Sequence, residues 1–156
     1  MSRAFVREDD PTGGAAVLPD RAISPHPNLV TRRGLRLIEA RVREFERLLA
    51  EASADAERSR AARELRYWVA RLGTARLENP PDSPEAVRFG TTVIVISEGG
   101  SETSYAIVGE DEAEPSAGRI AWTAPLARAL LGGEVGEVCR LPKGDFGIVA
   151  IRPNAE

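Results

Sequence analysis

Two runs of apolar residues with heptad spacing constrain the fold of this chain more than any other feature. The first run recurs at alternating spacings of three and four residues: Leu35, Ile38, Val42, Phe45 and Leu49. The second run follows the same rule: Ala61, Leu65, Trp68, Leu72 and Ala75. Because this spacing places apolar side chains along one stripe of a helix, the sequence predicts two helices that pack against each other.

The segment between the two runs is short, and Asn79, Pro80 and Pro81 stop the second helix. We therefore expect an antiparallel helical hairpin, a two-helix coiled coil, over residues 28–79. Helices of about 20 residues give it a length on the order of 30 Å. Such a rod buries only one stripe of each helix and therefore adds little stability. A hairpin that extends away from the domain to reach a partner explains its presence better. The alternative is an ordinary interaction module that packs on the sheet or on another chain. Pairing of the two stripes within one chain favours a monomer.

The second half of the chain carries strand and turn signals. Five segments are candidate strands: residues 93–96, 105–108, 120–122, 135–141 and 146–151. A short helix is expected after the third strand, with Thr123 as its cap, Pro125 in its first turn and Gly132 at its end. The predicted fold class is α+β: a helical hairpin, then an antiparallel sheet domain over residues 82–153 with one short covering helix.

The N-terminal segment, residues 1–27, contains Pro11, Pro19, Pro25 and Pro27 and shows almost no apolar periodicity. This composition predicts a disordered tail. The single histidine of the chain, His26, lies between two of these prolines, where no base or metal ligand can be held in place. We therefore expect His26 to have no chemical role.

Composition excludes several function classes. With one cysteine, Cys139, and one histidine, the chain can form neither an internal disulfide nor a zinc site of the Cys/His type. We expect Cys139 to fill core space in a strand. The net charge of −3 and the lack of a concentrated basic stripe argue against direct binding to duplex DNA. No apolar run is long enough to span a membrane and no secretory signal is present, so we expect a cytoplasmic location.

An acidic run formed by Glu110, Asp111, Glu112 and Glu114 lacks the spacing of a calcium-binding loop. We interpret this run as a solvated turn. No metal site is predicted for this chain.

Several motifs of the C-terminal half resemble the Gre family, the bacterial transcript cleavage and elongation factors GreA and GreB with the related regulator Rnk. They are FGTTV at 89–93, YAIVGEDEA at 105–113, GRI at 118–120 and APLARALLGGEVGE at 124–137. The resemblance covers about residues 29–151. It implies a long helical hairpin followed by a domain of FKBP-like fold. It also implies a non-enzymatic factor that binds bacterial RNA polymerase and meets nucleic acid only through that polymerase.

In the Gre family the hairpin enters the secondary channel of the polymerase, and its acidic tip helps a second Mg²⁺ bind in the polymerase active site for cleavage of backtracked RNA. The family's tip sequence is absent here, and Asp55 and Glu57 are the tip candidates. Acids at this position are also explained by the helix dipole, with Ser53 or Asp55 as a cap. The only cofactor that the resemblance implies is Mg²⁺ shared with the polymerase.

The resemblance places the grip on the polymerase rim at the turn before the short helix, where this chain has Thr123, Ala124 and Pro125. Trp122 beside them is either a further anchor for the partner or a residue of the sheet face. We take Trp122, Thr123 and Pro125 as the candidate polymerase-binding residues. The predicted function is regulation of transcript elongation or cleavage. The hairpin is shorter than in GreA and GreB by about 12 Å, which resembles Rnk. A competitor that binds polymerase without stimulating cleavage is therefore the alternative.

A more remote alternative is an FKBP-like peptidyl-prolyl isomerase, because the expected domain shares the plan of that enzyme family. Fold alone does not confer activity. The pocket of such an isomerase is lined by many aromatic side chains, and beyond residue 82 this chain has only Phe89, Tyr105, Trp122 and Phe146.

Overall fold

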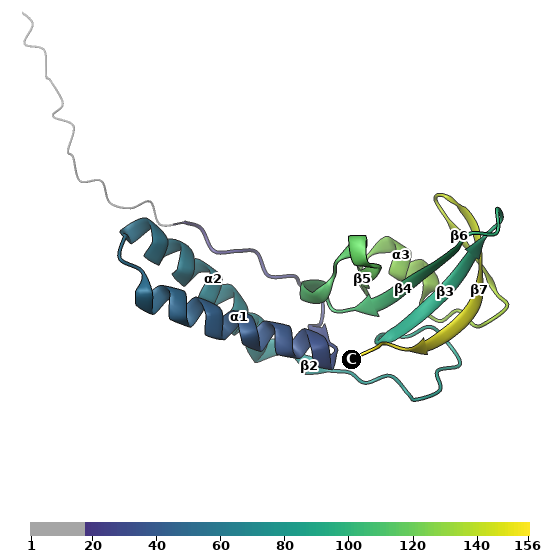
Figure 1. The fold of residues 1–156 in the computed structure, drawn as a ribbon, viewed down its shortest axis with the longest axis horizontal. Coiled ribbons are helices and arrows are strands. Elements are labelled where there is room, and N and C mark those ends of the chain that lie inside the picture. The colour runs from purple at the N-terminus through teal and green to yellow at the C-terminus, as the bar shows by residue number, and fades with distance from the viewer. Residues whose placement is uncertain (1–17) are drawn as a thin grey trace, which may run out of the picture.

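The computed structural model describes residues 18–156, in which a helical hairpin projects from a sheet domain (Figure 1). The hairpin consists of α1 (Arg32–Glu51) and α2 (Asp55–Thr74), flanked by the two-residue strands β1 (Leu29–Val30) and β2 (Arg76–Leu77). No helix in this described part of the chain is both long and apolar enough to cross a membrane.

The two helices of the hairpin pack along the predicted heptad stripes. Each helix is 20 residues long. Ile38 and Val42 of α1 are buried against Trp68 of α2. Around them pack further stripe residues, namely Leu35, Phe45, Leu65 and Leu72. Beyond the hairpin base, the two helices contact each other and project away from the sheet domain, as Figure 1 shows. The prediction of an antiparallel helical hairpin is confirmed.

The sheet domain contains a mixed sheet whose strands lie in the order β5-β4-β3-β7-β6. Its elements are β3 (Thr91–Ser97), β4 (Glu102–Val108), the 3-10 turns η1 (Glu110–Glu112) and η2 (Pro115–Ala117), β5 (Arg119–Ala121), α3 (Pro125–Leu130), β6 (Val138–Leu141) and β7 (Gly144–Pro153). The short helix α3 covers one face, where Leu130 packs with Val93, Ile107 and Ile148 in the core. The predicted α+β fold class is confirmed.

One strand pairing differs from the expected antiparallel pattern. β5 runs parallel to β4, with Ile107 opposite Ile120, whereas all other pairs in this sheet are antiparallel. The reason is the connection between them: η1 and η2 carry the chain back from the end of β4 to a point opposite Ala106, so β5 runs in the same direction beside the last three residues of β4. Strand periodicity alone does not contain this information.

The hairpin and the sheet domain meet at residues 109–112, and the centre of this joint is Arg71. Arg71 lies in the last turn of α2 and its side chain is 2% exposed. Its Nε donates to Asp111 Oδ2 at 2.5 Å, and its Nη2 lies 3.7 Å from Glu110 Oε2. The hydroxyl of Tyr67, one turn earlier, also donates to Asp111. A cation at the C-terminal end of α2 is thus neutralised by carboxylates from the other part of the protein.

Glu112 makes the second half of the joint, at the opposite helix end. The first turn of α1 has no acid of its own, and the Thr31 hydroxyl there donates to Glu112 Oε2 at 2.5 Å. A carboxylate is favourable at this positive helix end. Two glycines permit the close approach: a Cβ on Gly34 would lie 2.8 Å from Glu112 Oε2, and one on Gly109 would lie 2.5 Å from the Leu29 carbonyl oxygen.

The interpretation of the acidic run as a solvated turn is therefore wrong for its first three residues. Glu112 is buried, and the Asp111 side chain is only 9% exposed. Only Glu114, which pairs with Arg119, stays largely exposed. The error has a physical cause, because a charge pattern in sequence does not show which acids meet a buried arginine.

The N-terminal segment also differs from its prediction where it is described. Residues 18–27 lie along α2 rather than apart from the fold, and Arg21 Nη1 donates to Glu64 Oε2 at 2.6 Å. The remainder of the predicted disordered tail, residues 1–17, lies outside the described residues.

Removing the Asp111 carboxylate should destabilise the whole protein. The Asp111→Ala variant leaves the buried Arg71 with only the longer contact to Glu110, so we expect the free energy of unfolding to fall by about 3–5 kcal/mol. The matched control is Arg47→Ala, which breaks the Arg47–Glu51 pair whose side chains are 60% and 62% exposed. This control should cost no more than about 1 kcal/mol. Urea unfolding followed by circular dichroism measures the free energy of unfolding of both variants. Equal losses of stability in the two variants would contradict the conclusion that the buried Arg71–Asp111 pair stabilises the fold more than an exposed pair does.

Candidate functional site

The turn between β5 and α3 holds the three predicted partner-contact residues. The backbone N–H of Trp122 donates to Val108 O at 2.9 Å, which extends the β4–β5 pairing by one residue. Pro125 is the first residue of α3 and is exposed. Its fixed φ and missing N–H suit this position. The turn therefore presents a proline at the surface, next to a half-buried tryptophan.

Thr123 has a different role from the predicted one. The N-cap of α3 is Ala124, without a side-chain hydrogen bond, so the expectation that Thr123 caps the helix is wrong. Its hydroxyl instead donates to Glu110 Oε1 at 3.1 Å. The side chain is thus turned toward the joint, where its hydroxyl donates to a carboxylate instead of accepting from the first turn of α3.

Trp122 lies between the sheet core and the N-terminal segment. One side of its ring packs against the core cluster. The His26 ring meets it edge-on, with centroids 5.9 Å apart and planes at 75°. The indole Nε1 is buried and has no hydrogen-bond partner among the described residues. His26 thus has a packing role that the sequence did not predict, although no catalytic or metal-binding role follows from it.

Glu110 connects the turn, the joint and the N-terminal segment. Its Oε1 accepts hydrogen bonds from Thr123 and from Ser24, at 3.1 and 3.0 Å. Its Oε2 faces Arg71 at 3.7 Å. Sequence reasoning missed both Glu110 and Arg71. The only signal was an arginine between Trp68 and Leu72, close to a predicted apolar stripe, where a buried charge must find a partner.

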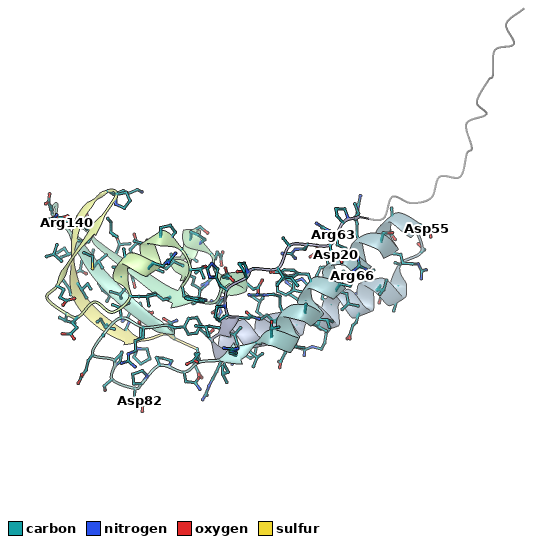
Figure 2. All side chains as sticks on the ribbon, turned by 180° about the vertical axis from the view of Figure 1, so that it is seen from behind. Asp20, Asp55, Arg63, Arg66, Asp82 and Arg140 are labelled. Atoms are coloured by element: carbon teal, nitrogen blue, oxygen red, sulfur yellow. The ribbon has the colours of Figure 1, made fainter. Side chains whose placement is uncertain are left out.

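The hairpin tip carries the other predicted site residues, Asp55 and Glu57. Both are exposed in the first turn of α2, and Figure 2 shows Asp55 at the end of the rod. The N-cap of α2 is Ala54 with no side-chain hydrogen bond, so capping by Ser53 or Asp55 is wrong. Within residues 18–156 no three His, Cys, Asp or Glu side chains are grouped in a way that could hold a metal ion. The two acids can add negative charge, but cannot by themselves form a closed metal site.

Cys139 lies in β6 and packs against the core, as predicted. Burial raises the pKa of its thiol, and the negative charge of Glu137 raises it further. Because the thiolate is the reactive form, this environment makes Cys139 a poor nucleophile.

The sequence comparisons agree with the observed sheet domain. Residues 81–153 match the family model described as "Transcription elongation factor, GreA/GreB, C-term". Transcription elongation factor GreA of Phenylobacterium zucineum is 51% identical over 57 residues, which cover 36% of either chain. GreA of Thermomicrobium roseum is 38% identical over 102 residues, 65% of this chain and 51% of the relative. The matches thus span about a third to a half of the length of these curated relatives.

Solved structures give weaker matches. GreA factor homolog 1 (Gfh1) of Thermus thermophilus aligns with a TM-score of 0.39 and 21% identity, over 81% of this chain and 99% of the other. The GreA/GreB elongation factor from Nitrosomonas europaea aligns with a TM-score of 0.40 and 21% identity, over 81% and 98%. Scores of this size leave the sequence matches as the basis for assigning the C-terminal domain.

The joint should give Tyr67 an unusual titration. Burial, the hydrogen bond to Asp111 and the Asp111 charge raise the pKa of Tyr67 from 10.0 to about 12. The folded protein therefore holds this proton more tightly than the unfolded chain does. The resulting stabilisation is complete below pH 10 and is lost as the pH rises through about 12.

Tyrosinate absorbance measures this pKa in a Tyr105→Phe background, which leaves Tyr67 as the only tyrosine. Adding Asp111→Asn should lower the pKa of Tyr67, because the neighbouring negative charge is removed. It should stay above 10.0, since burial is the largest cause of the shift. An unchanged pKa in the Asn variant would contradict the contact between Tyr67 and Asp111.

Proposed function

We propose that the chain is a Gre-family factor, because residues 81–153 match the GreA/GreB family model, and that it binds bacterial RNA polymerase at the secondary channel and regulates transcript elongation. The observation that carries this proposal is the combination of that domain with a projecting helical hairpin. In this proposal the protein is an accessory factor, and any RNA cleavage is performed by the polymerase. It acts as a monomer, because the heptad stripes are already paired within one chain.

The shape supports a factor that reaches into a channel. Two helices of 20 residues extend about 30 Å, and the buried joint sets their direction relative to the sheet domain. A hairpin fixed at its base by buried charges can transmit a grip on the rim to a defined tip position. A loosely linked hairpin cannot, since its tip samples many directions.

The β5–α3 turn supports the grip on the rim. Pro125 is exposed, and Trp122 and Thr123 stand beside it on the same side as the joint. Tryptophan anchors are enriched among residues that dominate binding energy. In this proposal Trp122 and Pro125 contact the polymerase, while Thr123 keeps the turn in place through Glu110.

The tip favours the competitor over the cleavage factor. Asp55 and Glu57 lie in the first turn of α2, where the helix dipole accounts for them. Arg58, which donates to the Ala52 carbonyl at 3.1 Å, brings a positive charge to the same turn. The positive charge of Arg58 offsets the negative charges of the two acids, and this disfavours binding of a second Mg²⁺ near the tip. Within the proposed function, we therefore favour a factor that occupies the channel without stimulating cleavage.

Substitutions in the turn should weaken binding to polymerase. We expect Trp122→Ala to reduce the affinity for bacterial core polymerase by about tenfold or more, and Pro125→Ala to reduce it less. The affinity is measured by biolayer interferometry, with circular dichroism to verify folding.

The control is Arg140→Ala, whose side chain is 90% exposed at the far end of the sheet domain (Figure 2). This variant should bind like the wild type. If both turn variants bind with the affinity of the wild type, the turn is not part of the polymerase interface. If the wild type does not bind core polymerase, the proposed function is refuted.

The tip should not support RNA cleavage. In stalled, backtracked elongation complexes with Mg²⁺, we expect the RNA to shorten no faster with the protein than with polymerase alone. The double variant Asp55→Asn, Glu57→Gln should behave identically and bind equally well, because these acids lie in exposed positions. Shortened RNA with the wild type that disappears in the double variant would identify a cleavage factor instead.

A further inference from the structure

Residues 18–27, here called the strap, run along α2 from near the tip to the joint (Figure 1). Arg63 Nε donates to the Pro19 carbonyl at 2.6 Å, and Arg66 Nε donates to Asp20 Oδ1 at 2.7 Å. Figure 2 shows Asp20 beside these two arginines, midway along the hairpin. Side chains of α2 therefore hold the first part of the strap.

Arg21 makes the most extensive contact of the strap with the hairpin. Its guanidinium carbon lies 3.7 Å from the centroid of the Tyr67 ring, and its Nη1 donates to Glu64 at 2.6 Å. A guanidinium stacked on an aromatic ring and paired with a carboxylate is well placed to fix a segment that has no secondary structure.

The end of the strap reaches the sheet domain. Ser24 donates to Glu110 Oε1, the same oxygen that accepts from Thr123. His26 packs edge-on against Trp122. The strap thus meets both the residue that positions the β5–α3 turn and the tryptophan assigned to the interface.

Every hydrogen bond that joins the strap to the hairpin or the sheet domain involves at least one side chain. No backbone-to-backbone hydrogen bond joins residues 18–26 to the rest of the described chain. The Arg66–Asp20 pair is 51% and 68% exposed, and the Arg21–Glu64 pair is 33% and 24% exposed. An exposed pair such as Arg66–Asp20 contributes little, which leaves the partly buried Arg21 contacts as the main hold on the strap. Because no ladder of backbone hydrogen bonds has to break, the strap can leave while the hairpin and the sheet stay folded.

Trp122 is incompletely satisfied while the strap is in place. Its indole Nε1 is buried without an acceptor among the described residues. Burying an unpaired donor is unfavourable. A partner that brings an acceptor to this N–H would remove that cost, which favours exchange of the strap for the partner.

We propose that the strap is a detachable cover over Trp122 that competes with RNA polymerase for this tryptophan. The inference rests on the proposed function for the identity of the competitor, but the cover itself is a property of the isolated chain. Release of the strap exposes the edge of Trp122 and breaks the hydrogen bond from Ser24 to Glu110 Oε1, whereas the bond from Thr123 remains.

The cover is tested first without polymerase, in the full-length protein. Acrylamide quenching of fluorescence is compared with and without Arg21→Ala and His26→Ala together, in a Trp68→Phe background that leaves Trp122 as the only tryptophan. We expect a several-fold larger quenching constant in the double variant. The control Arg47→Ala, an exposed arginine of α1 away from the strap, should leave it unchanged. The quenching constants are also compared with both tryptophans present, because that measurement does not depend on the Trp68→Phe substitution in the hairpin core.

Competition is tested by the affinity for core polymerase. If the cover is closed in about nine of ten molecules, opening it should tighten the affinity about tenfold in the double variant. Weaker binding would make the strap part of the interface and overturn the proposal, as would unchanged quenching. Increased quenching with unchanged affinity would overturn the competition. If no variant binds polymerase, the proposed function fails, whereas the quenching result still decides whether the strap covers Trp122.

Discussion

The buried pairing of Arg71 with Asp111 and Glu110 is the interaction on which the rest of the structure depends. A guanidinium that is 2% exposed is strongly unfavourable without partners. Here the partners come from a segment 40 residues away in the chain. Each part of the protein therefore supplies what the other needs. Without the sheet domain, Arg71 at the hairpin base would be a buried charge without a partner. Without the hairpin, Asp111 and Glu110 would lose the arginine that they contact.

The same joint uses the two helix ends that meet at the base of the hairpin, one from α1 and one from α2. Asp111 faces the C-terminal end of α2 through Arg71, and Glu112 faces the N-terminal end of α1 through Thr31. Both contacts follow the polarity of the helix dipole. A two-helix rod has little buried surface of its own, so these charges at its base, together with the β1–β2 pair, determine how firmly the rod is directed.

The functional features gather around one carboxylate. Glu110 contacts Arg71 of the joint, Thr123 of the turn and Ser24 of the strap. Glu110 is therefore in direct contact with all three places. Under the proposed function, these contacts connect the grip on the polymerase with the base of the hairpin and with the cover over Trp122. The exposed acids of the tip make no contact with this network.

The two helices, the approximate places of the five strands and the resemblance of the C-terminal half could be read from the sequence, although the strand predicted over residues 135–141 begins only at Val138. Heptad spacing and strand patterning report which face of an element is buried, and this information is local. The tertiary structure alone decided the partners of the acidic run, the parallel β4–β5 pair, the position of the strap and the role of Thr123. These depend on contacts between segments 13 to 86 residues apart, such as Thr123 and Ser24 on Glu110. Whether a charged side chain lies in solvent or in an ion pair depends on which distant segment packs against it. A local sequence pattern does not contain this information.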